Sequence, residues 1–371
     1  MATRLAQTYL TLLFGKNEKD VTTSLAPDLL SFSYTDNETN EADEISITLK
    51  DEKGKWAGTW RPDGGEVVKA HISIGNTVGK KSGHLYCGKF YVDSISMKGA
   101  PRTFELKAIS IPLNKPIRRR LKTRAWEKKT LKEIAAKIAK EAELDLLYDA
   151  DEPISYDRQD QDRQSDLTFL SKLCEEAGLS LKVTDEKLVI FDQYAYENKK
   201  SVKTFTLGVS DILSWSFESQ KSDTYKSCTV SYRDPKQKKK SEAASYSTKL
   251  SEDWAEIQNK KKGKNSAVMT YTYVDPMEED SDQEYALKRR ATSLAEAKRL
   301  AKAKLRKLNS RKVTGSLDIV GDPSMVAGVV ITLKGFAPTL DGRFLVEQAT
   351  HTVDGGGYKT ALQLRRINAN Y

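Results

Sequence analysis

Residues 164–183 read QSDLTFLSKLCEEAGLSLKV, a stretch in which a helical pattern gives way directly to a strand pattern. Ser165 stands where a helix N-cap is expected, because its hydroxyl can accept a hydrogen bond from an unpaired amide of the first turn. Gly178 follows the helical pattern, at a position where a left-handed backbone costs glycine nothing. The turn TDEK and the apolar run LVIF come next. The stretch therefore predicts a helix that ends sharply and continues into a β-hairpin.

The same plan occurs 35 residues earlier. Thr130 and Glu133 match a capping box, in which the two side chains satisfy backbone amides at the start of a helix. The helix that follows, LKEIAAKIAKEA, has an apolar face and a face of Lys and Glu. The positions that correspond are Thr130 and Ser165, Ile134 and Phe169, Ile138 and Leu173, and EAEL (141–144) and EAGL (176–179). We expect one helix-then-strand unit to occur twice, within a helix/hairpin module of residues 126–198.

Short segments with period-two alternation flank this module on both sides. Between residues 30 and 109 they read LSFSY, ISITLKD, VVKAHISIG, LYCGKFYVDSISM and RTFELKAIS, and the pattern resumes after residue 199. Such repetition is typical of sandwiches and barrels. A chain of 371 residues is also long enough for two or three domains. The predicted fold class is α+β and mainly β, with an N-terminal β domain (1–125) and a second β domain (199–371).

The second β domain contains two interruptions. Residues 235–280 are rich in Lys, Ser, Glu and Asp and poor in aliphatic residues, which favours a long exposed connection over core. Ser293 and Glu296 then begin a third capped helix, the connecting helix of residues 293–309. Its apolar stripe consists of Leu294, Ala297, Ala301, Leu305 and Leu308.

The formal net charge of +9 raises nucleic acid or an acidic protein as a partner. The basic residues lie in four runs: residues 115–124, 236–240 and 259–264, and the helix that ends at Lys312. Aromatic residues for single-strand stacking are absent between these charges, as are helix-turn-helix and zinc-finger patterns. Solvated loops and helix faces are the favoured interpretation of the runs, and a charged docking surface is the alternative.

No residue set points to a catalytic, cofactor-binding or metal site. The cysteines Cys87, Cys174 and Cys228 are far apart in the sequence and have apolar neighbours, so we expect buried, inert thiols. His71, His84 and His351 belong to no catalytic or metal-binding motif, although His84 does precede Cys87 by three residues. We expect a structural role for His351 within a strand.

Two further groups have both a functional and a structural interpretation. The carboxylates Glu175 and Glu176, or residues 278–280, could flank a glycosidic bond, but sequence does not give their separation in space. Trp56 and Trp60 lie on either side of a glycine turn, and we expect them to cover one end of a barrel rather than stack on a ligand. We also find no apolar run long enough for a spanning helix, and we expect no membrane anchoring.

The residues of several segments together resemble the phage late control protein D family, the tail hub proteins of contractile phage tails, which are related to the hub part of type VI secretion spike proteins. The C-terminal match lies within GDPSMVAGVVITLKGFAPTLDGRFLVEQATHTVDGGGYKTALQL (321–364) and includes Gly321, Pro323, Ala327, Gly328, Gly335, Asp341, Gly342, His351, Gly357, Tyr358 and Thr360. The central match comprises Ser165, Asp166, Leu167, Phe169, Leu170 and EAGL (176–179). The N-terminal match comprises Trp56, Trp60, Pro62, Gly65, Gly88, Phe90 and Asp93, ahead of Pro101. Residues 235–280 correspond to nothing in the family pattern.

The resemblance implies two tube-like antiparallel β-barrel domains per chain and a homotrimer that presents six similar barrels in a ring. Such a ring would adapt a sixfold tail tube to a threefold central spike. The implied partners are a separate spike protein, the tail tube protein or tube initiator, other baseplate proteins and the tape measure protein, with nucleic acid only passing through the lumen. The implied location is the baseplate of a virion or tail-like particle, assembled in the cytoplasm of the host bacterium.

The function expected from this resemblance is structural and not enzymatic. Two alternatives stay open at this point. One is a tail-associated peptidoglycan hydrolase, and the other is a basic protein that binds nucleic acid.

Overall fold

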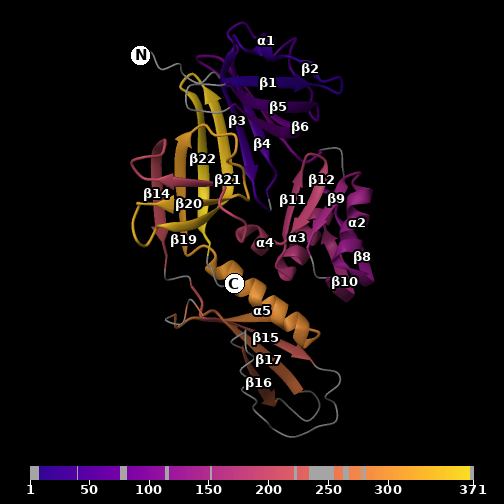
Figure 1. Ribbon diagram of the computed structural model, residues 1–371. Helices are drawn as coiled ribbons and strands as arrows, with labels where there is room; N and C mark the ends of the chain where they lie inside the picture. The colour runs from indigo at the N-terminus through magenta and orange to yellow at the C-terminus, as the bar shows by residue number, and fades with distance from the viewer. Residues whose placement is uncertain are drawn as a thin grey trace. The chain divides into compact units, whose positions relative to one another are not determined.

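The computed structural model describes residues 8–39, 41–75, 82–112, 117–150, 153–220, 224–233, 255–261, 267–276, 278 and 281–367. The β-strands are β1 (Thr8–Phe14), β2 (Lys19–Asp20), β3 (Leu29–Asn37), β4 (Glu44–Lys50), β5 (Val67–Ile74), β6 (Gly83–Lys98), β7 (Thr103–Ile109), β8 (Lys122–Thr130), β9 (Asp145–Asp149), β10 (Ser155–Gln164), β11 (Ser180–Thr184), β12 (Lys187–Phe191), β13 (Lys203–Thr206), β14 (Ile212–Ser219), β15 (Ser227–Arg233), β16 (Ala255–Lys261), β17 (Ala267–Val274), β18 (Glu284–Ala291), β19 (Val313–Val320), β20 (Val330–Lys334), β21 (Gly342–Asp354) and β22 (Gly357–Arg366). The helices are α1 (Thr22–Leu25), α2 (Leu131–Glu141), α3 (Asp166–Ala177), α4 (Gln193–Glu197) and α5 (Leu294–Asn309). The predicted mainly-β, α+β class is confirmed (Figure 1).

One sheet of 13 strands contains strands from both ends of the chain. Its order is β14-β19-β22-β21-β3-β4-β7-β6-β5-β1-β2, with β20 also paired to β21 and β13 paired to β20. The link between the two ends is the antiparallel pair β21 and β3, in which His351 lies opposite Tyr34. Closure of this sheet into two barrels stays a prediction.

The chain forms two compact units, and the predicted division into two β domains and a module stays a prediction. Unit 1 contains residues 1–171, 180–217 and 315–364, and unit 2 contains residues 172–179, 218–314 and 365–371. The long-range pairing of β21 with β3 gathers the terminal strands into unit 1. Sequence periodicity could not predict this division, because it shows where strands are and not which strands pair.

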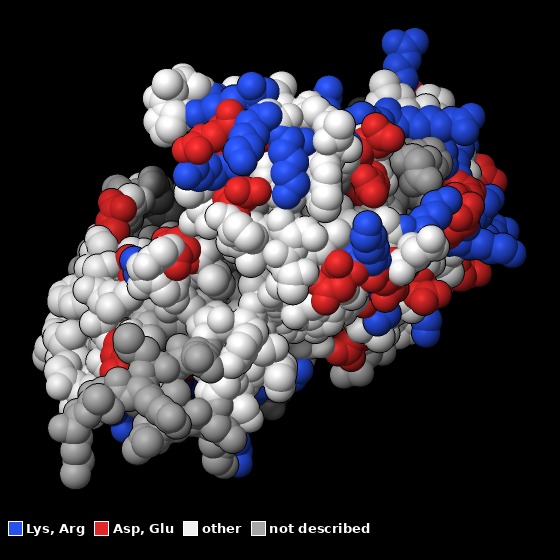
Figure 2. All heavy atoms as spheres, turned by 90° about the horizontal axis from the view of Figure 1, so that it is seen from above, with Lys and Arg blue, Asp and Glu red and all other residues white. Residues whose placement is uncertain are grey.

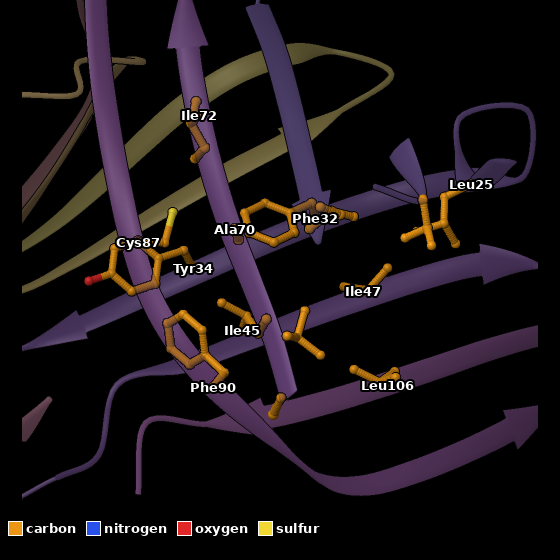
Figure 3. Packing of buried hydrophobic residues seen from close by; sticks show 14 of the residues in the cluster. Leu25, Phe32, Tyr34, Ile45, Ile47, Ala70, Ile72, Cys87, Phe90 and Leu106 are labelled. Atoms are coloured by element: carbon orange, nitrogen blue, oxygen red, sulfur yellow. The ribbon is translucent and has the colours of Figure 1, made fainter. Parts of the chain in front are cut away.

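The core of unit 1 follows from strand alternation. On β3 and β4 every second side chain is buried, so that Phe32 and Tyr34 face the same interior as Ile45 and Ile47. Figure 3 shows these side chains converging with Phe90 and Leu106 from neighbouring strands. Burial of each large apolar side chain contributes roughly 1.5–3 kcal/mol. The core thus holds the sheet in the register that its apolar pattern requires.

The helix–hairpin module, α2 to β12, has the predicted repeat. Thr130 caps α2 with both halves of a capping box, and the Ser165 hydroxyl accepts a hydrogen bond from the Thr168 amide at the start of α3. Each helix leads into a strand, and β9, β12 and β11 form one small sheet. Strands β11 and β12 make the predicted hairpin, while β9 runs parallel to β12.

Both helices of the repeat end in the same way. Glu143 and Gly178 follow their helices with positive φ angles of 52° and 75°. The next amides, of Leu144 and Leu179, donate to the carbonyl five residues earlier at 2.9 and 2.8 Å, as in a Schellman motif. The sequence match between EAEL and EAGL is therefore a match of backbone conformation, although only the second copy has glycine at the left-handed position.

The expectation of a loop throughout residues 235–280 is wrong for its described part. Residues 255–261 and 267–274 form β16 and β17, which join β15 and β18 in a four-stranded sheet of unit 2. Met269, Tyr271 and Tyr273 are buried in the core between this sheet and α5. The small number of aliphatic residues led to the prediction of a loop, but the buried side chains of β17 are mostly aromatic. The basic run 236–240 lies outside the described residues.

The αL position after α2 generates a stability prediction. We expect Glu143→Gly to raise the free energy of unfolding by about 0.5–1 kcal/mol, because glycine removes the steric cost of the left-handed conformation. The matched control is Gly178→Ala, whose Cβ would lie 3.3 Å from the Ala303 Cβ, and it should lower the same free energy by about 1 kcal/mol. Urea denaturation of both variants measures the difference. Changes of the same sign would contradict this account of the repeat.

Candidate functional site

A buried cluster of charge joins the helix–hairpin module to the main sheet. Lys182 on β11 extends its ammonium to two carboxylates: it contacts Oδ1 of Asp36 on β3 and lies 3.0 Å from Oδ1 of Asp43, just before β4. Both carboxylates are buried, and the Lys182 side chain is 15% exposed. Burial alone would lower the pKa of Lys182, but the two carboxylates outweigh it and raise that pKa. The lysine is held in its charged form.

Hydrogen bonds extend this cluster to other segments of unit 1. The amide of Ala327, in the segment before β20, donates to Asp36 Oδ2 at 2.9 Å. The Ser110 hydroxyl, after β7, accepts from the Asp43 amide at 3.1 Å and donates to the Val183 carbonyl at 2.8 Å. Segments from the N-terminal strands, the module and the C-terminal strands are thus fixed by one polar centre.

The cluster carries one carboxylate more than its single cation can neutralise. Burial raises the pKa of Asp43 to about 6, the Lys182 charge opposes this shift, and the neighbouring Asp36 adds to it. Near pH 7 the cluster is anionic, and near pH 5 Asp43 holds a proton. Asp43 therefore favours folding more at pH 4 than at pH 7.

His351 forms a second buried polar centre, on β21. Its Nε2 lies 2.9 Å from the Met325 carbonyl, which can only accept, so Nε2 carries the proton. Nδ1 then accepts from the Tyr358 hydroxyl at 2.7 Å, and Thr360 Oγ1 lies 3.2 Å away. Burial lowers the pKa of His351 to about 4, and the ring stacks on Tyr34. The predicted structural role of His351 is confirmed by these contacts.

Three of the residues that carry the C-terminal resemblance, Gly321, Tyr358 and Thr360, meet near this histidine. A Cβ on Gly321 would lie 2.1 Å from the Tyr358 ring, so only glycine allows the chain to pass there. The Gly321 amide donates to the Tyr358 carbonyl at 2.9 Å, and the next amide, of Asp322, donates to Thr360 Oγ1 at 3.1 Å. The motif is thus a packing unit.

Part of the first basic run is already neutralised. Lys122 and Arg124 on β8 contact the buried Asp166 at 2.5 and 2.7 Å, and both also pair with Glu141. The Gln161 side chain donates to Asp166 at 2.9 Å. These two cations therefore brace the start of α3 and are not a free surface for a polyanion.

The two N-terminal tryptophans border a cavity of about 270 Å³. Trp56 is buried in the core, and its Nε1 donates to Asp28 Oδ2 at 2.9 Å. Trp60 packs edge-on against Trp56 and is 43% exposed, and the Lys55 ammonium lies 4.2 and 4.5 Å from the two ring centroids. Trp56 has a structural role, while its contribution to a barrel end stays a prediction.

The remaining sequence candidates have separate places in the fold. Cys87, Cys174 and Cys228 are free and buried, and burial raises the pKa of each thiol, to about 12 for Cys174 and about 11 for Cys228. His71 packs against Tyr86, and Nδ1 of His84 lies 2.9 Å from the Ser73 hydroxyl. Glu175, Glu176 and Glu278 each form an ion pair with a cation of unit 2, and Glu279 and Asp280 lie outside the described residues.

The described residues contain no group of three or more His, Cys, Asp or Glu side chains placed to hold a metal ion. Among the same residues, no helix is both long and apolar enough to cross a membrane.

Sequence reasoning missed Lys182, Asp36 and Asp43 altogether. Each stands in an ordinary strand or turn pattern, and Lys182 is 146 residues away from Asp36. Lys182 stands between the apolar residues Leu181 and Val183 on a short hairpin strand. In such an alternating pattern the polar position normally lies on the exposed face of the strand, so the sequence gives no sign that Lys182 is buried. Its burial becomes visible only when the sheet pairing is known.

Removal of the central cation generates the first prediction at this site. We expect Lys182→Met to lower the free energy of unfolding by about 3–5 kcal/mol, because it leaves two buried carboxylates without a cation. Lys122→Met is the matched control, and it should cost less because Arg124 and Gln161 still contact Asp166. Chemical denaturation at pH 7 compares the two. Equal losses would contradict the central place given to Lys182.

The two buried titrating groups generate a prediction with opposite signs. His351 has a folded pKa below its ordinary 6.5, so its stabilisation is lost as pH falls from 6.5 to 4, by about 3 kcal/mol. Asp43 has a folded pKa above its ordinary 3.8, so folding gains about 2 kcal/mol as pH falls from 6 to 4.

We therefore expect the unmodified chain to lose stability relative to His351→Gln on acidification, and to gain it relative to Asp43→Asn. Urea denaturation at pH 7, 5.5 and 4 gives both differences. Two differences of the same sign would refute the assignment of these groups.

The sequence and the fold of this chain are similar to those of known phage tail proteins. Residues 91–357 match the family described as phage tail baseplate hub (GPD). The chain is 26% identical over 363 residues to the probable baseplate hub protein of Escherichia phage 186, covering 94% of this chain and 90% of that protein.

Two solved structures share the fold. The 43 kDa tail protein of prophage MuSo2 from Shewanella oneidensis has a TM-score of 0.67 at 12% identity, over 97% of this chain and 98% of that one. A type VI secretion system component of E. coli, described as similar to bacteriophage T4 tail proteins, has a TM-score of 0.53 at 11% identity. The match covers 100% of this chain and 77% of that one. Since the family match spans more than two thirds of its residues, the chain belongs to the phage tail baseplate hub family.

Proposed function

We propose that three copies of this chain form a ring in the baseplate, which joins the sixfold tail tube to the threefold central spike. The proposal assigns one barrel domain to residues 1–125 and one to residues 199–371, so that three chains present six similar barrels. Membership of the baseplate hub family supports a structural role in a phage tail or a tail-like particle.

The observation that carries the proposed ring is the exposed strand at one end of the main sheet. The strand order of unit 1 ends at β14, which pairs with β19 on one side and with no other described strand. Leu213 and Trp215 of this strand are 53% and 43% exposed, and the nearby Val209 is 81% exposed. A free edge with apolar side chains is a place where another chain can add hydrogen bonds and bury surface. In a ring of subunits every such edge meets a neighbour.

The remaining partners follow from the place of a hub in a tail. We propose that the ring binds a separate spike protein on one side, and the tail tube protein or tube initiator on the other. Other baseplate proteins and the tape measure protein complete its contacts, and nucleic acid only passes through the lumen. Assembly takes place in the cytoplasm of the host bacterium.

We propose no enzymatic activity for this chain. The described carboxylates that could have served a hydrolase are engaged in ion pairs, among them Glu175 with Lys307 at 2.7 Å and Glu278 with Lys312 at 2.6 Å. A zymogram on purified cell walls tests this directly, and clearing that depends on one of these carboxylates would contradict it.

The exposed edge generates a prediction about assembly. Light scattering should give three times the chain mass for the purified protein, alone or with the spike. Leu213→Glu should shift the protein toward monomer, because it places a charge on the edge that meets the neighbour. Met97→Glu, at a side chain of similar exposure on β6, is the matched control and should stay trimeric. A monomer with tail partners present would overturn the ring, and an unchanged mass for Leu213→Glu would exclude β14 from the interface.

A further inference from the structure

The positive charge of this protein is concentrated in one short segment. Residues 284–312 contain eleven Lys and Arg and two Glu, a net charge of +9. The whole chain of 371 residues also has a net charge of +9, so all the other residues together are neutral. On the face drawn in Figure 2, Lys and Arg are interspersed with Asp and Glu. Residues 284–312 therefore carry as much net charge as the whole chain, whereas acidic residues balance the other basic runs.

This segment forms β18 and α5 of unit 2, and the helix lies along the four-stranded sheet (Figure 1). Ala297, Leu300, Ala301 and Leu305 face the sheet and are buried. Apolar packing therefore fixes which side of the helix its lysines occupy.

Lys298 and Lys302, one turn apart, lie on the same flank of α5. Their Nζ atoms lie 5.8 and 6.0 Å from the ring centroids of Tyr271 and Tyr273 on β17. Arg299 adds a third cation directly after Lys298, and its side chain is partly buried. We call these three residues the α5 basic face. Both ammonium groups therefore lie near aromatic rings that are themselves buried.

The carboxylates of this unit leave the α5 basic face without partners. Within the described residues no ion pair includes Lys298, Arg299 or Lys302, and Arg299 Nε is buried with no hydrogen-bond acceptor. The last turn of the same helix and the residues after it do bind carboxylates, through Lys307 and Lys312. Within the described part of the chain, carboxylates therefore pair with the end of this basic segment but not with Lys298, Arg299 or Lys302.

We infer that the α5 basic face is a docking site for an acidic segment of a partner protein. Two observations favour a protein over nucleic acid. Arg289 and Lys307 of the same basic segment pair with carboxylates of the protein itself. Tyr271 and Tyr273 are buried, so they offer no surface on which a base could stack. The choice of a protein also rests on the proposed role as a baseplate hub, which is surrounded by other proteins.

The spacing of the face defines the segment further. Lys298 and Lys302 are separated by roughly 6 Å along the helix. In an extended chain, side chains on one face repeat about every 6.6 Å. A segment with Asp or Glu at every second position therefore matches the two lysines, and the next acidic residue can reach Arg299.

The test uses the full-length chain and a fluorescent twelve-residue peptide of alternating Glu and Ser as the probe. We expect anisotropy to show binding at low salt that weakens as salt rises, and Lys298→Gln, Arg299→Gln, Lys302→Gln combined to weaken it about tenfold or more. The control combines Lys16→Gln, Lys53→Gln and Lys200→Gln, three exposed lysines of unit 1, and should change the affinity less than about twofold.

Three results would overturn the inference: no binding, equal weakening by both triple variants, or tighter binding of a 20-base-pair DNA duplex at the same salt. Light scattering measures the oligomeric state of the variant Lys298→Gln, Arg299→Gln, Lys302→Gln, and so distinguishes failure of the docking site from failure of the proposed trimeric ring. A trimer that has lost peptide binding supports the docking site, whereas a monomeric unmodified chain refutes the ring without bearing on α5.

Discussion

The ammonium of Lys182, buried between Asp36 and Asp43, is the interaction on which the arrangement of unit 1 depends. A buried charge is tolerated only where it is paired, and a cation removed from two buried carboxylates leaves both uncompensated. The two aspartates come from the β3 and β4 region, the lysine comes from β11, and the amide of Ala327 completes the coordination of Asp36. Apolar packing makes each of these layers stable, but it is non-directional. The charge cluster fixes how these segments are arranged relative to one another, because its ion pairs and hydrogen bonds form only in one arrangement.

Around the Lys182 cluster, polar contacts fix the relative positions of the strands, and apolar packing stabilises the core between them. His351 is kept neutral by burial and fixed in one tautomer by a carbonyl, and it holds β21 to the Met325 segment and to Tyr358 on β22. The close passage of Gly321 under the Tyr358 ring explains why glycine stands there. These contacts fix the relative position of β21, β22 and the Met325 segment, because none of them can shift without leaving a buried polar group unsatisfied.

Local features were predictable from the sequence, and long-range ones were not. The caps at Thr130, Ser165 and Ser293 and the stop at Gly178 depend on residues within one turn, and all lie where they were expected. The pairing of β21 with β3 and the contact of Lys182 with Asp36 join residues that no periodicity connects. The strand at residues 267–274 was missed because its buried side chains are tyrosines and a methionine within a polar region. The resemblance to tail hub proteins identified the family, although its motif residues explain packing and not an interface.

The central claim is that three copies of this chain occupy the junction of tail tube and spike. An electron cryo-microscopy reconstruction of the tail particle, made with a tag on this chain, measures both its position and its copy number. The account predicts tag density with threefold symmetry directly above the spike. Tag density elsewhere in the particle, or a copy number other than three at the junction, would contradict it.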